Sequence, residues 1–479
     1  MGTGRDNLVS RLGTSDRPLR VAIVGAGPAG FYVLQHLFQE QDLRVQADMF
    51  DRLPTPFGLV RQGVAPDHQK IKSVVRVYEK LAQDPRYRFF GNIEFGKELS
   101  LEDLHERYDQ IVFTTGAQTD RKLGIPGEDL EGSYPAAAFV AWYNGHPDYS
   151  HLKFDLRGRR AVVIGLGNVA VDVARVLSQT NDELARTDIA DYALKELAAS
   201  TIEEVHLLGR RGPAEAAFTN HEATELGELT ETEARACLDS EEVESLMREL
   251  DPASDRLARA KLEILLDLAK RREPGKKNRL LIRFLVSPVE LQGDDQGHVR
   301  KIRLVHNELY HDDEGAVRAR PTEKETILRA DAVFRSVGYK GAPLPGLPFR
   351  DDWGIIPNTQ GRVMDPASGE TMTGVYVSGW IKRGPTGVIG TNKADARETV
   401  ECMAVDRMAG RVLKDTDRAG EPIEHLLESR GARYVTYADW LDLDRIELIR
   451  GQVAGRPRVK FTSREEFLQV LDALEPPVD

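Results

Sequence analysis

The stretch Leu19–Gly30 constrains the fold of this 479-residue chain more than any other. An apolar run, Leu19–Val24, predicts a buried parallel strand, and a helical pattern begins soon after it, at about Pro28. Three glycines with the spacing G-x-G-x-x-G allow a tight turn, the close approach of a pyrophosphate, and packing of the helix on the strand: Gly25, Gly27 and Gly30. The helix N-terminus then faces the phosphates.

The next predicted strand, Val45–Phe50, ends at Asp51. A carboxylate in this position accepts hydrogen bonds from ribose hydroxyls, so we expect the unit to bind a dinucleotide. The alternative is an ordinary strand–turn–helix with tight packing.

A second unit of the same kind begins at Arg160. The predicted strand Ala161–Ile164 is followed by G-x-G-x-x-A and a helix, with the ligand-facing turn formed by Gly165, Gly167, Asn168, Val169 and Ala170.

The next strand of this second unit, Glu204–Leu208, comes after an insertion and is followed by Arg210 and Arg211. The acid of an NAD site is missing here. Guanidinium groups form bidentate hydrogen bonds with phosphate, so the pair is expected to bind the 2′-phosphate of NADP. A solvated arginine pair is the alternative.

Charge and hydropathy exclude several classes of protein. Lysine and arginine number 65 against 77 aspartates and glutamates, and the net charge of −12 disfavours nucleic acid as the main partner. No apolar run reaches the about 18 residues of a membrane helix. Residues 1–20 are polar and lack a signal-peptide core, so we expect a loose N-terminal tail and a cytoplasmic protein with no membrane insertion.

The cysteines are Cys237 and Cys402. Two distant cysteines argue against a disulfide framework or a cysteine-ligated cluster, and they exclude a Cys-x-x-Cys dithiol. We expect each to be a buried apolar thiol, and we predict no metal site.

Two nucleotide units imply an α/β fold with two Rossmann-like domains. FAD suits the first unit, because it carries no 2′-phosphate and pairs naturally with a nicotinamide. Hydride would pass from the nicotinamide to the flavin. Since no dithiol is available, reduced flavin must meet its acceptor directly, and a one-electron carrier protein is the natural partner.

Five motifs resemble those of the adrenodoxin-reductase-type NADPH:ferredoxin oxidoreductases, which are FAD-dependent ferredoxin–NADP(+) reductases. The motifs are Gly25–Gly30, Leu53–His68, Gly165–Ala170, Gly209–Pro213 and Gly379–Asn392. The resemblance extends over most of residues 18–455. It implies a glutathione-reductase-like fold of three-layer ββα type and electron exchange with a ferredoxin-type iron–sulfur protein. We expect an FAD-binding domain of residues 1–118 and 355–479 and an NADP-binding domain of residues 119–354.

The resemblance also implies contact residues. Those for FAD are Ala29, Asp51, Leu59, Ile93, Trp380, Gly387, Val388 and Ile389. Those for NADP are Gly167, Asn168, Val169, Ala170, Arg210, Arg211, Glu222 and Gly387. Asp51 stands where the family more often has Glu. Trp380 stands where the wider flavin reductase class has an Asp that contacts the ribitol, so backbone atoms are expected to replace that contact.

Two catalytic candidates, His68 and Glu225, match family positions near the nicotinamide and flavin. Hydride transfer needs no general base, so we expect them to tune proton or hydride steps. The alternatives are a loop-packing histidine and an ordinary carboxylate on a helix surface.

Other segments carry weaker predictions. Helix is predicted for residues 69–82 and for most of residues 230–272, strand for Phe89–Phe95, and a mixture of both for residues 421–479. The run Lys270–Arg279 is strongly basic, and it is either a solvated turn or a docking patch for an acidic partner.

Two other functions remain open at this point. A flavin monooxygenase or oxidase would pass its electrons to O₂. A reductase-like subunit or NADP-sensing module of a larger complex would bind the nucleotides without turning them over.

Overall fold

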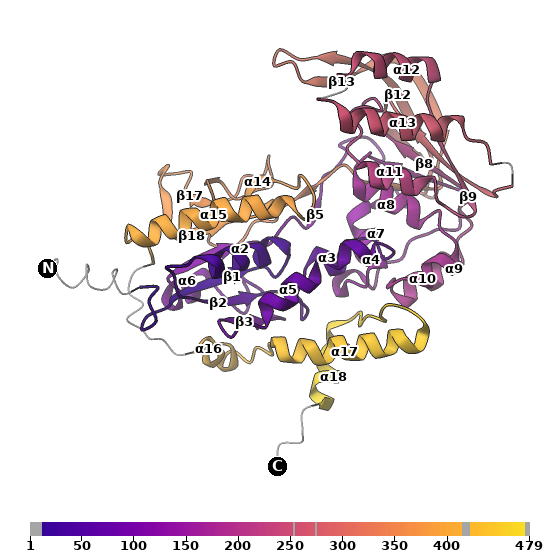
Figure 1. Cartoon of the computed structure of the whole chain (residues 1–479). Helices are drawn as coiled ribbons and strands as arrows, with labels where there is room; N and C mark the ends of the chain where they lie inside the picture. Colours follow the sequence, from indigo (N-terminus) through magenta and orange to yellow (C-terminus); the bar gives the residue numbers. More distant parts are fainter. Residues whose placement is uncertain (1–11, 252–253, 274, 414–421, 475–479) are drawn as a thin grey trace.

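The computed structural model describes residues 12–251, 254–273, 275–413 and 422–474. Within these residues, a mainly parallel sheet and a wholly parallel sheet, each with its helices, lie side by side (Figure 1). The C-terminal helices, in yellow, run along the lower side of the view from the first sheet toward α10 of the second. The α/β fold class predicted from the two glycine-rich turns is confirmed.

The first sheet has the strand order β16-β17-β18-β4-β1-β2-β3, and the strands from β18 to β3 run parallel. Its strands are β1 (Leu19–Val24), β2 (Val45–Phe50), β3 (Tyr87–Phe90), β4 (Gln110–Phe113), β16 (Asn358–Thr359), β17 (Arg362–Met364) and β18 (Thr371–Val377). Helices α2 and α15 pack together over one face, and their apolar side chains share a core with β1 and β2. The central strands are apolar on both faces because both faces are covered.

The helices of this part are α2 (Pro28–Gln39), α3 (Leu59–Gln62), α4 (Gln69–Lys72), α5 (Val75–Ala82), α6 (Leu101–Arg107), α14 (Trp380–Arg383), α15 (Thr391–Met408), α16 (Ile423–Ser429), α17 (Tyr437–Ala454) and α18 (Arg464–Leu474). Pro28 begins α2, where its fixed φ suits a first helical residue. Helix α17 begins at a capping box formed by Thr436 and Asp439 and ends at Gly455, whose left-handed φ of +69° turns the chain out of the helix.

The second sheet is parallel throughout, in the order β6-β14-β7-β8-β10-β9. Its strands are β6 (Ser133–Pro135), β7 (Arg160–Ile164), β8 (Glu204–Leu208), β9 (Thr232–Cys237), β10 (Asn278–Arg283) and β14 (Ala332–Arg335). Its helices are α7 (Ala136–Tyr143), α8 (Asn168–Val176), α9 (Asn181–Leu184), α10 (Asp191–Ala198), α11 (Asn220–Leu226), α12 (Ser240–Glu249) and α13 (Arg256–Lys270), with a 3₁₀ turn, η1 (Pro147–Tyr149).

An antiparallel sheet of β11 (Val286–Gly293), β12 (Val299–His311) and β13 (Val317–Arg329) packs on the second sheet. Residues from β7 and β8 share an apolar cluster with β11 and β12, including Ile164, Leu208, Leu291 and Ile302. Helices cover the other face, which gives the predicted layers of helix, parallel sheet and antiparallel sheet. A short ribbon of β5 (Thr119–Asp120) and β15 (Tyr339–Lys340) lies where the chain passes between the two units.

Several predicted elements are wrong in detail. The helix predicted for residues 69–82 is divided between α4 and α5, and the strand predicted for Phe89–Phe95 ends at Phe90, so Ile93 lies outside it. Residues 230–272 contain the strand β9, whose alternate residues Thr232, Ala234 and Ala236 are buried. Its charged outer side chains hid the period of two that identifies a strand.

The predictions for the two ends also need correction. Residues 1–11 lie outside the described residues, but residues 12–18 are not a loose tail, because Leu12 is buried and Arg17 pairs with Asp109 at 2.8 Å. Among the described residues of the C-terminal region, the regular elements are the helices α16, α17 and α18, and the strand signal amounts to a single bridge between Gly91 and Val435. Nowhere in the described part of the chain does a helix combine the length and the apolar character that a membrane crossing needs.

Candidate active site

The first glycine-rich turn has the geometry that its sequence predicts. Gly25 has a φ of +113°, and a Cβ there would lie 2.6 Å from the Thr114 carbonyl oxygen. A Cβ at Gly30 would lie 2.3 Å from the Gly25 oxygen, so this glycine lets α2 approach the strand end. A Cβ at Gly27 would meet only the Gly58 Cα, at 4.0 Å. Gly25 and Gly30 therefore serve the turn, whereas Gly27 leaves space for a ligand.

A cavity of about 800 Å³ opens in front of this turn. Seven of the predicted FAD-site residues line it: Gly25, Gly27, Ala29, Asp51, Leu59, Ile93 and Trp380. The buried indole nitrogen of Trp380 has no hydrogen-bond partner within the described residues. An elongated ligand with polar atoms along its length fits these residues, and FAD is such a ligand.

Asp51 is tied to the glycine-rich turn itself. One carboxylate oxygen accepts a hydrogen bond from the Ala26 N–H at 2.7 Å, and the other accepts from the Leu53 N–H at 2.9 Å. Burial raises the pKa of the Asp51 carboxyl, although the two backbone hydrogen bonds oppose the rise. The side chain is thus fixed beside the cavity at the end of β2, where a ribose contact is predicted.

The second turn joins β7 to α8 and is built in the same way. Gly165 has a φ of +135°, and a Cβ there would lie 2.2 Å from the Ser336 carbonyl oxygen. Gly167 is the N-cap of α8 and has open space in front of it. The Asn168 side chain accepts a hydrogen bond from the Thr219 N–H at 3.0 Å, while Val169 lines the large cavity. Both turns therefore contribute residues to the lining of the same cavity.

The arginine pair follows β8. Hydrogen bonds fix the backbone of the pair, whereas its guanidinium groups are available to a ligand. The Arg210 carbonyl accepts from Asn307 at 2.8 Å, and the Arg211 carbonyl accepts from the Leu285 N–H at 3.1 Å. Neither guanidinium has a hydrogen-bond or ion-pair partner among the residues that the structure describes. Glu222, on α11, is buried, and its Oε2 has no partner within the same residues. The two guanidinium groups can bind a phosphate, and the Glu222 carboxylate can accept a hydrogen bond from a donor on the same ligand.

His68 and Glu225 come together across the two units. His68 Nε2 lies 2.8 Å from a Glu225 carboxylate oxygen, and the Nδ1 lies 3.6 Å from Asp172. Arg175 also lies 2.8 Å from Nε2, and it pairs with Asp67. Which contact to Nε2 is the hydrogen bond depends on where the imidazole protons lie. Asp67 and His68 precede α4 of the first unit. Asp172 and Arg175 lie on α8 of the second unit, and Glu225 lies on its α11.

The charged groups of this cluster shift one another's pKa. Burial lowers the pKa of His68, but the hydrogen bond to Glu225 and the charge of Asp172 outweigh it, so the pKa is raised. Burial raises the pKa of Glu225, but His68 and Arg175 outweigh it, so that pKa is lowered. Burial raises the pKa of Asp172 to about 7 against the attraction of His68 and Arg175. An ion pair between His68 and Glu225 is therefore favoured beside a carboxyl that titrates near neutral pH.

Asp172 and Arg175 were missed by the sequence analysis, which considered only the apolar residues of this helix. They lie three positions apart on α8, directly after the glycine-rich turn, and both are buried. A charged i, i+3 pair in the apolar face of a helix is the signal that could have identified them.

Other predicted residues lie outside the cavity lining. Gly387, Val388 and Ile389 form a loop before α15, where Val388 is 51% exposed, and none of the three lines the cavity. Their contact with a cofactor stays a prediction. Cys402 is buried as expected, but Cys237 is exposed, because it occupies an outward-facing position of β9.

The basic run Lys270–Arg279 also contributes nothing to the cavity lining, and its Pro274 lies outside the described residues. Lys276 donates to the Leu229 carbonyl at 2.7 Å and pairs with Glu273, while Arg279 pairs with Glu204. These contacts favour the solvated turn over the docking patch.

Comparisons with known proteins agree with this geometry. Residues 19–211 match the family model described as pyridine nucleotide-disulphide oxidoreductase. The chain is 45% identical to the NADPH-ferredoxin reductase FprA of Mycobacterium tuberculosis over 464 residues, which cover 95% of this chain and 99% of that protein. It is 39% identical over 467 residues to the mitochondrial NADPH:adrenodoxin oxidoreductase of Arabidopsis thaliana, covering 95% of each. The solved structure of M. tuberculosis FprA in complex with NADPH superposes with a TM-score of 0.88 at 45% identity, over 95% of this chain and 100% of that one.

Proposed function

This chain belongs to the family of NADPH-ferredoxin and NADPH:adrenodoxin oxidoreductases, and we propose that it is an FAD-dependent ferredoxin–NADP(+) oxidoreductase. It is an oxidoreductase with FAD and NADP(H) as cofactors. When bound, FAD supplies a group that takes a hydride from NADPH and passes electrons singly to an iron–sulfur carrier.

One observation carries this proposal: the large cavity receives side chains from both nucleotide units, and neither cysteine lines it. A disulfide reductase of this fold needs a dithiol beside its flavin, and this chain has none to offer. The arrangement supports direct passage of electrons from the flavin to an external acceptor.

We assign the residues of the first turn, together with Asp51, Leu59, Ile93 and Trp380, to FAD. The residues of the second turn, with Arg210, Arg211 and Glu222, are assigned to NADP(H). Gly387, Val388 and Ile389 stay assigned to the cofactors by the family resemblance. We further propose an FAD-binding domain of residues 1–118 and 355–479 and an NADP-binding domain of residues 119–354. The β5–β15 ribbon, which pairs the first residues of the second domain with Tyr339–Lys340 near its end, supports this division.

His68 and Glu225 are proposed to tune proton movement at the meeting point of the two cofactors. Their contact crosses between the units, and Asp172 beside them titrates near neutral pH. None of these three residues lines the cavity, and their nearness to the flavin is what the family resemblance implies. A group that titrates near neutral pH can hold or release a proton when the charge of a nearby flavin changes.

The test is an absorption spectrum of the purified protein, followed by titration with NADPH. A yellow protein that NADPH bleaches anaerobically, and that reduces cytochrome c only when a ferredoxin is added, is the expected result. Fast reoxidation by O₂ alone would favour the oxidase instead. Bound FAD with no NADPH-dependent bleaching would favour a nucleotide-binding subunit, and a colourless protein that takes up no FAD would contradict the proposal.

A further inference from the structure

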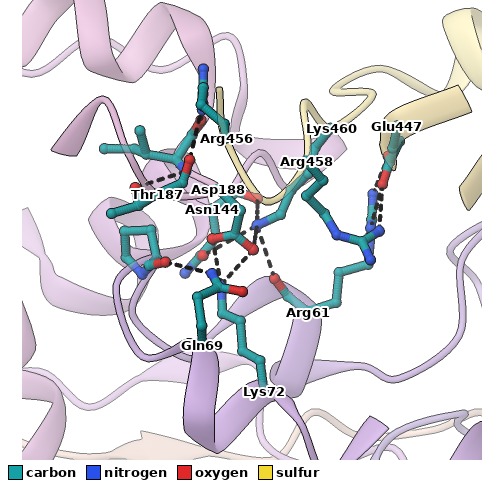
Figure 2. Close-up of polar contacts among 12 residues, drawn as sticks. Arg61, Gln69, Lys72, Asn144, Thr187, Asp188, Glu447, Arg456, Arg458 and Lys460 are labelled. Carbon is teal, nitrogen blue, oxygen red and sulfur yellow. Dashed lines mark hydrogen bonds and ion pairs between the residues drawn. The ribbon is translucent and has the colours of Figure 1, made fainter. Parts of the chain in front are cut away.

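A cluster of buried charged residues lies outside the cavity, where the C-terminal segment passes between the two units (Figure 2). We call residues 437–460, which comprise α17 and the segment after it, the C-terminal strap. Its Glu447 side chain is 0% exposed and its Lys460 side chain is 1% exposed. Buried charges are rare unless they are paired, so each of these groups needs its partners in place.

Glu447 holds the short helix that forms one wall of the FAD cavity. It receives a bidentate pair of hydrogen bonds from Arg61, at 2.8 and 2.5 Å, and accepts a third from the Phe461 N–H at 2.9 Å. Arg61 belongs to α3, and its neighbours Leu59 and Gln62 line the cavity. The strap thus fixes the position of α3 from behind the cavity wall.

Lys460 joins the strap to both units at once. Its Nζ donates to the Asn144 carbonyl at 3.1 Å and to the Arg61 carbonyl at 3.3 Å, and it pairs with Asp188 at 3.2 Å. Asp188 lies between α9 and α10 of the second unit, and Lys72 of the first unit also binds it, at 2.7 Å. Two lysines from different parts of the chain therefore meet on one carboxylate, as Figure 2 shows.

Arg456, in the same segment after α17 as Lys460, attaches the strap to the second unit only. Its guanidinium donates to the Thr187 carbonyl at 2.9 Å, and it also contacts the Ile189 carbonyl and the Asp191 carboxylate. The strap therefore binds the FAD-side helix α3 through Glu447, in α17, and binds the insertion of the NADP-side unit through Arg456, in the segment after α17.

Buried ion pairs are weak evidence for stability, because the desolvation of the charges offsets most of their attraction. The directional hydrogen bonds of these ion pairs do, however, fix the relative positions of the segments that they join. Hydride transfer is sensitive to geometry, since a displacement of about 1 Å can cost about 100-fold in rate. A contact that sets how the two units sit relative to one another acts directly on the distance between the nicotinamide and the flavin.

We propose that Glu447, Arg456 and Lys460 are positioning residues, which hold the FAD-binding and NADP-binding units in the relative placement that hydride transfer requires. This inference rests on the function proposed above. None of the three residues lines the cavity, and they act through α3 and through the segment 187–191.

The main test is Arg456→Ala, because this change removes contacts to the second unit only and leaves the buried Glu447 pair intact. We expect the variant to keep its FAD, while the rate of flavin bleaching by NADPH in stopped flow falls about tenfold and the KM for NADPH rises. Lys460→Met is a second variant and is expected to have a larger effect on the same two quantities. Reoxidation of the photoreduced flavin by ferricyanide should stay at the wild-type rate in both.

Arg430→Ala is the matched control. Arg430 also binds a carboxylate and a backbone carbonyl, those of Asp103 and Glu98, but both lie on the FAD side. This variant should lower the melting temperature without changing the bleaching rate. The proposal is overturned if Arg456→Ala loses stability like the control and keeps wild-type bleaching and KM. A wild-type protein that NADPH does not bleach would instead refute the proposed function, so the two failures are distinguishable.

Discussion

The two nucleotide-binding units share one backbone design and differ in the residues that follow the second strand. Both place a left-handed glycine at the end of the first strand, because a Cβ there would collide with the backbone carbonyl of Thr114 in the first unit and of Ser336 in the second. After β2 the first unit has Asp51, which its backbone holds in place. After β8 the second unit has Arg210 and Arg211, whose guanidiniums have no partner in the described residues. We therefore predict that the glycine-rich backbone binds a dinucleotide in each unit and that the side chains after the second strand distinguish FAD from NADP(H).

The largest effect is expected within the first turn, from a comparison of Gly25→Ala with Gly27→Ala. Gly25→Ala forces a left-handed φ on alanine and a contact of 2.6 Å with the Thr114 oxygen, and it should destabilise the fold by about 3 kcal/mol or more. Gly27→Ala has room in the protein and should weaken FAD binding alone. Thermal melting and FAD titration of the apoprotein measure the two effects. Equal melting temperatures for the two variants would contradict these separate roles.

A second effect should appear in the other unit, with Arg210→Ala combined with Arg211→Ala. Each charge-assisted hydrogen bond contributes about 1.5–3 kcal/mol, so the KM for NADPH should rise about 10- to 10⁴-fold. The KM for NADH, which lacks the 2′-phosphate, should change little and serves as the internal control. A rise of the same size in the KM for both nucleotides would contradict the assignment of these arginines to the 2′-phosphate.

The surface of the second unit offers a smaller effect. Converting Lys276, Lys277 and Arg279 to glutamine should reduce ferredoxin turnover a few-fold and flatten its dependence on salt, if the basic run attracts an acidic carrier. Arg318, Arg320 and Lys324, exposed on β13, provide an equal change of charge as the control. Of the three side chains changed, Lys276 and Arg279 are already paired within the protein. An unchanged salt profile would show that the carrier docks elsewhere.

The smallest effect concerns the contact between the units, tested by His68→Gln. Because the folded pKa of His68 is raised, its stabilisation is fully present below the unfolded pKa of about 6.5 and is lost as pH rises through the folded value. The variant should therefore be less stable than the wild type by about 1–2 kcal/mol between about pH 5 and 6.5, with the difference shrinking at higher pH. Urea unfolding across this range measures it, with exposed His311→Gln as the control. A difference that does not depend on pH would show that His68 is neutral in the fold.

The parts of the site that sequence analysis identified are those carried by a local pattern. The strand–turn–helix units, Asp51 and the arginine pair each follow from spacing along a few residues, and the structure places them directly after strands of the two parallel arrays. The strand β9 was missed because its outward side chains are charged. Asp172 and Arg175 were missed because their meaning depends on His68, which lies about a hundred positions away in the chain.

The amino-acid sequence by itself determined the two dinucleotide turns, because the steric demand of a left-handed glycine and the charge of one or two side chains are local properties. Only the tertiary structure decided how the two units meet. The pairing of His68 with Glu225, and the buried contacts of Glu447 and Lys460, join segments that no periodicity connects. Because these charges are buried, each needs a partner in place, whereas an exposed charge is solvated by water.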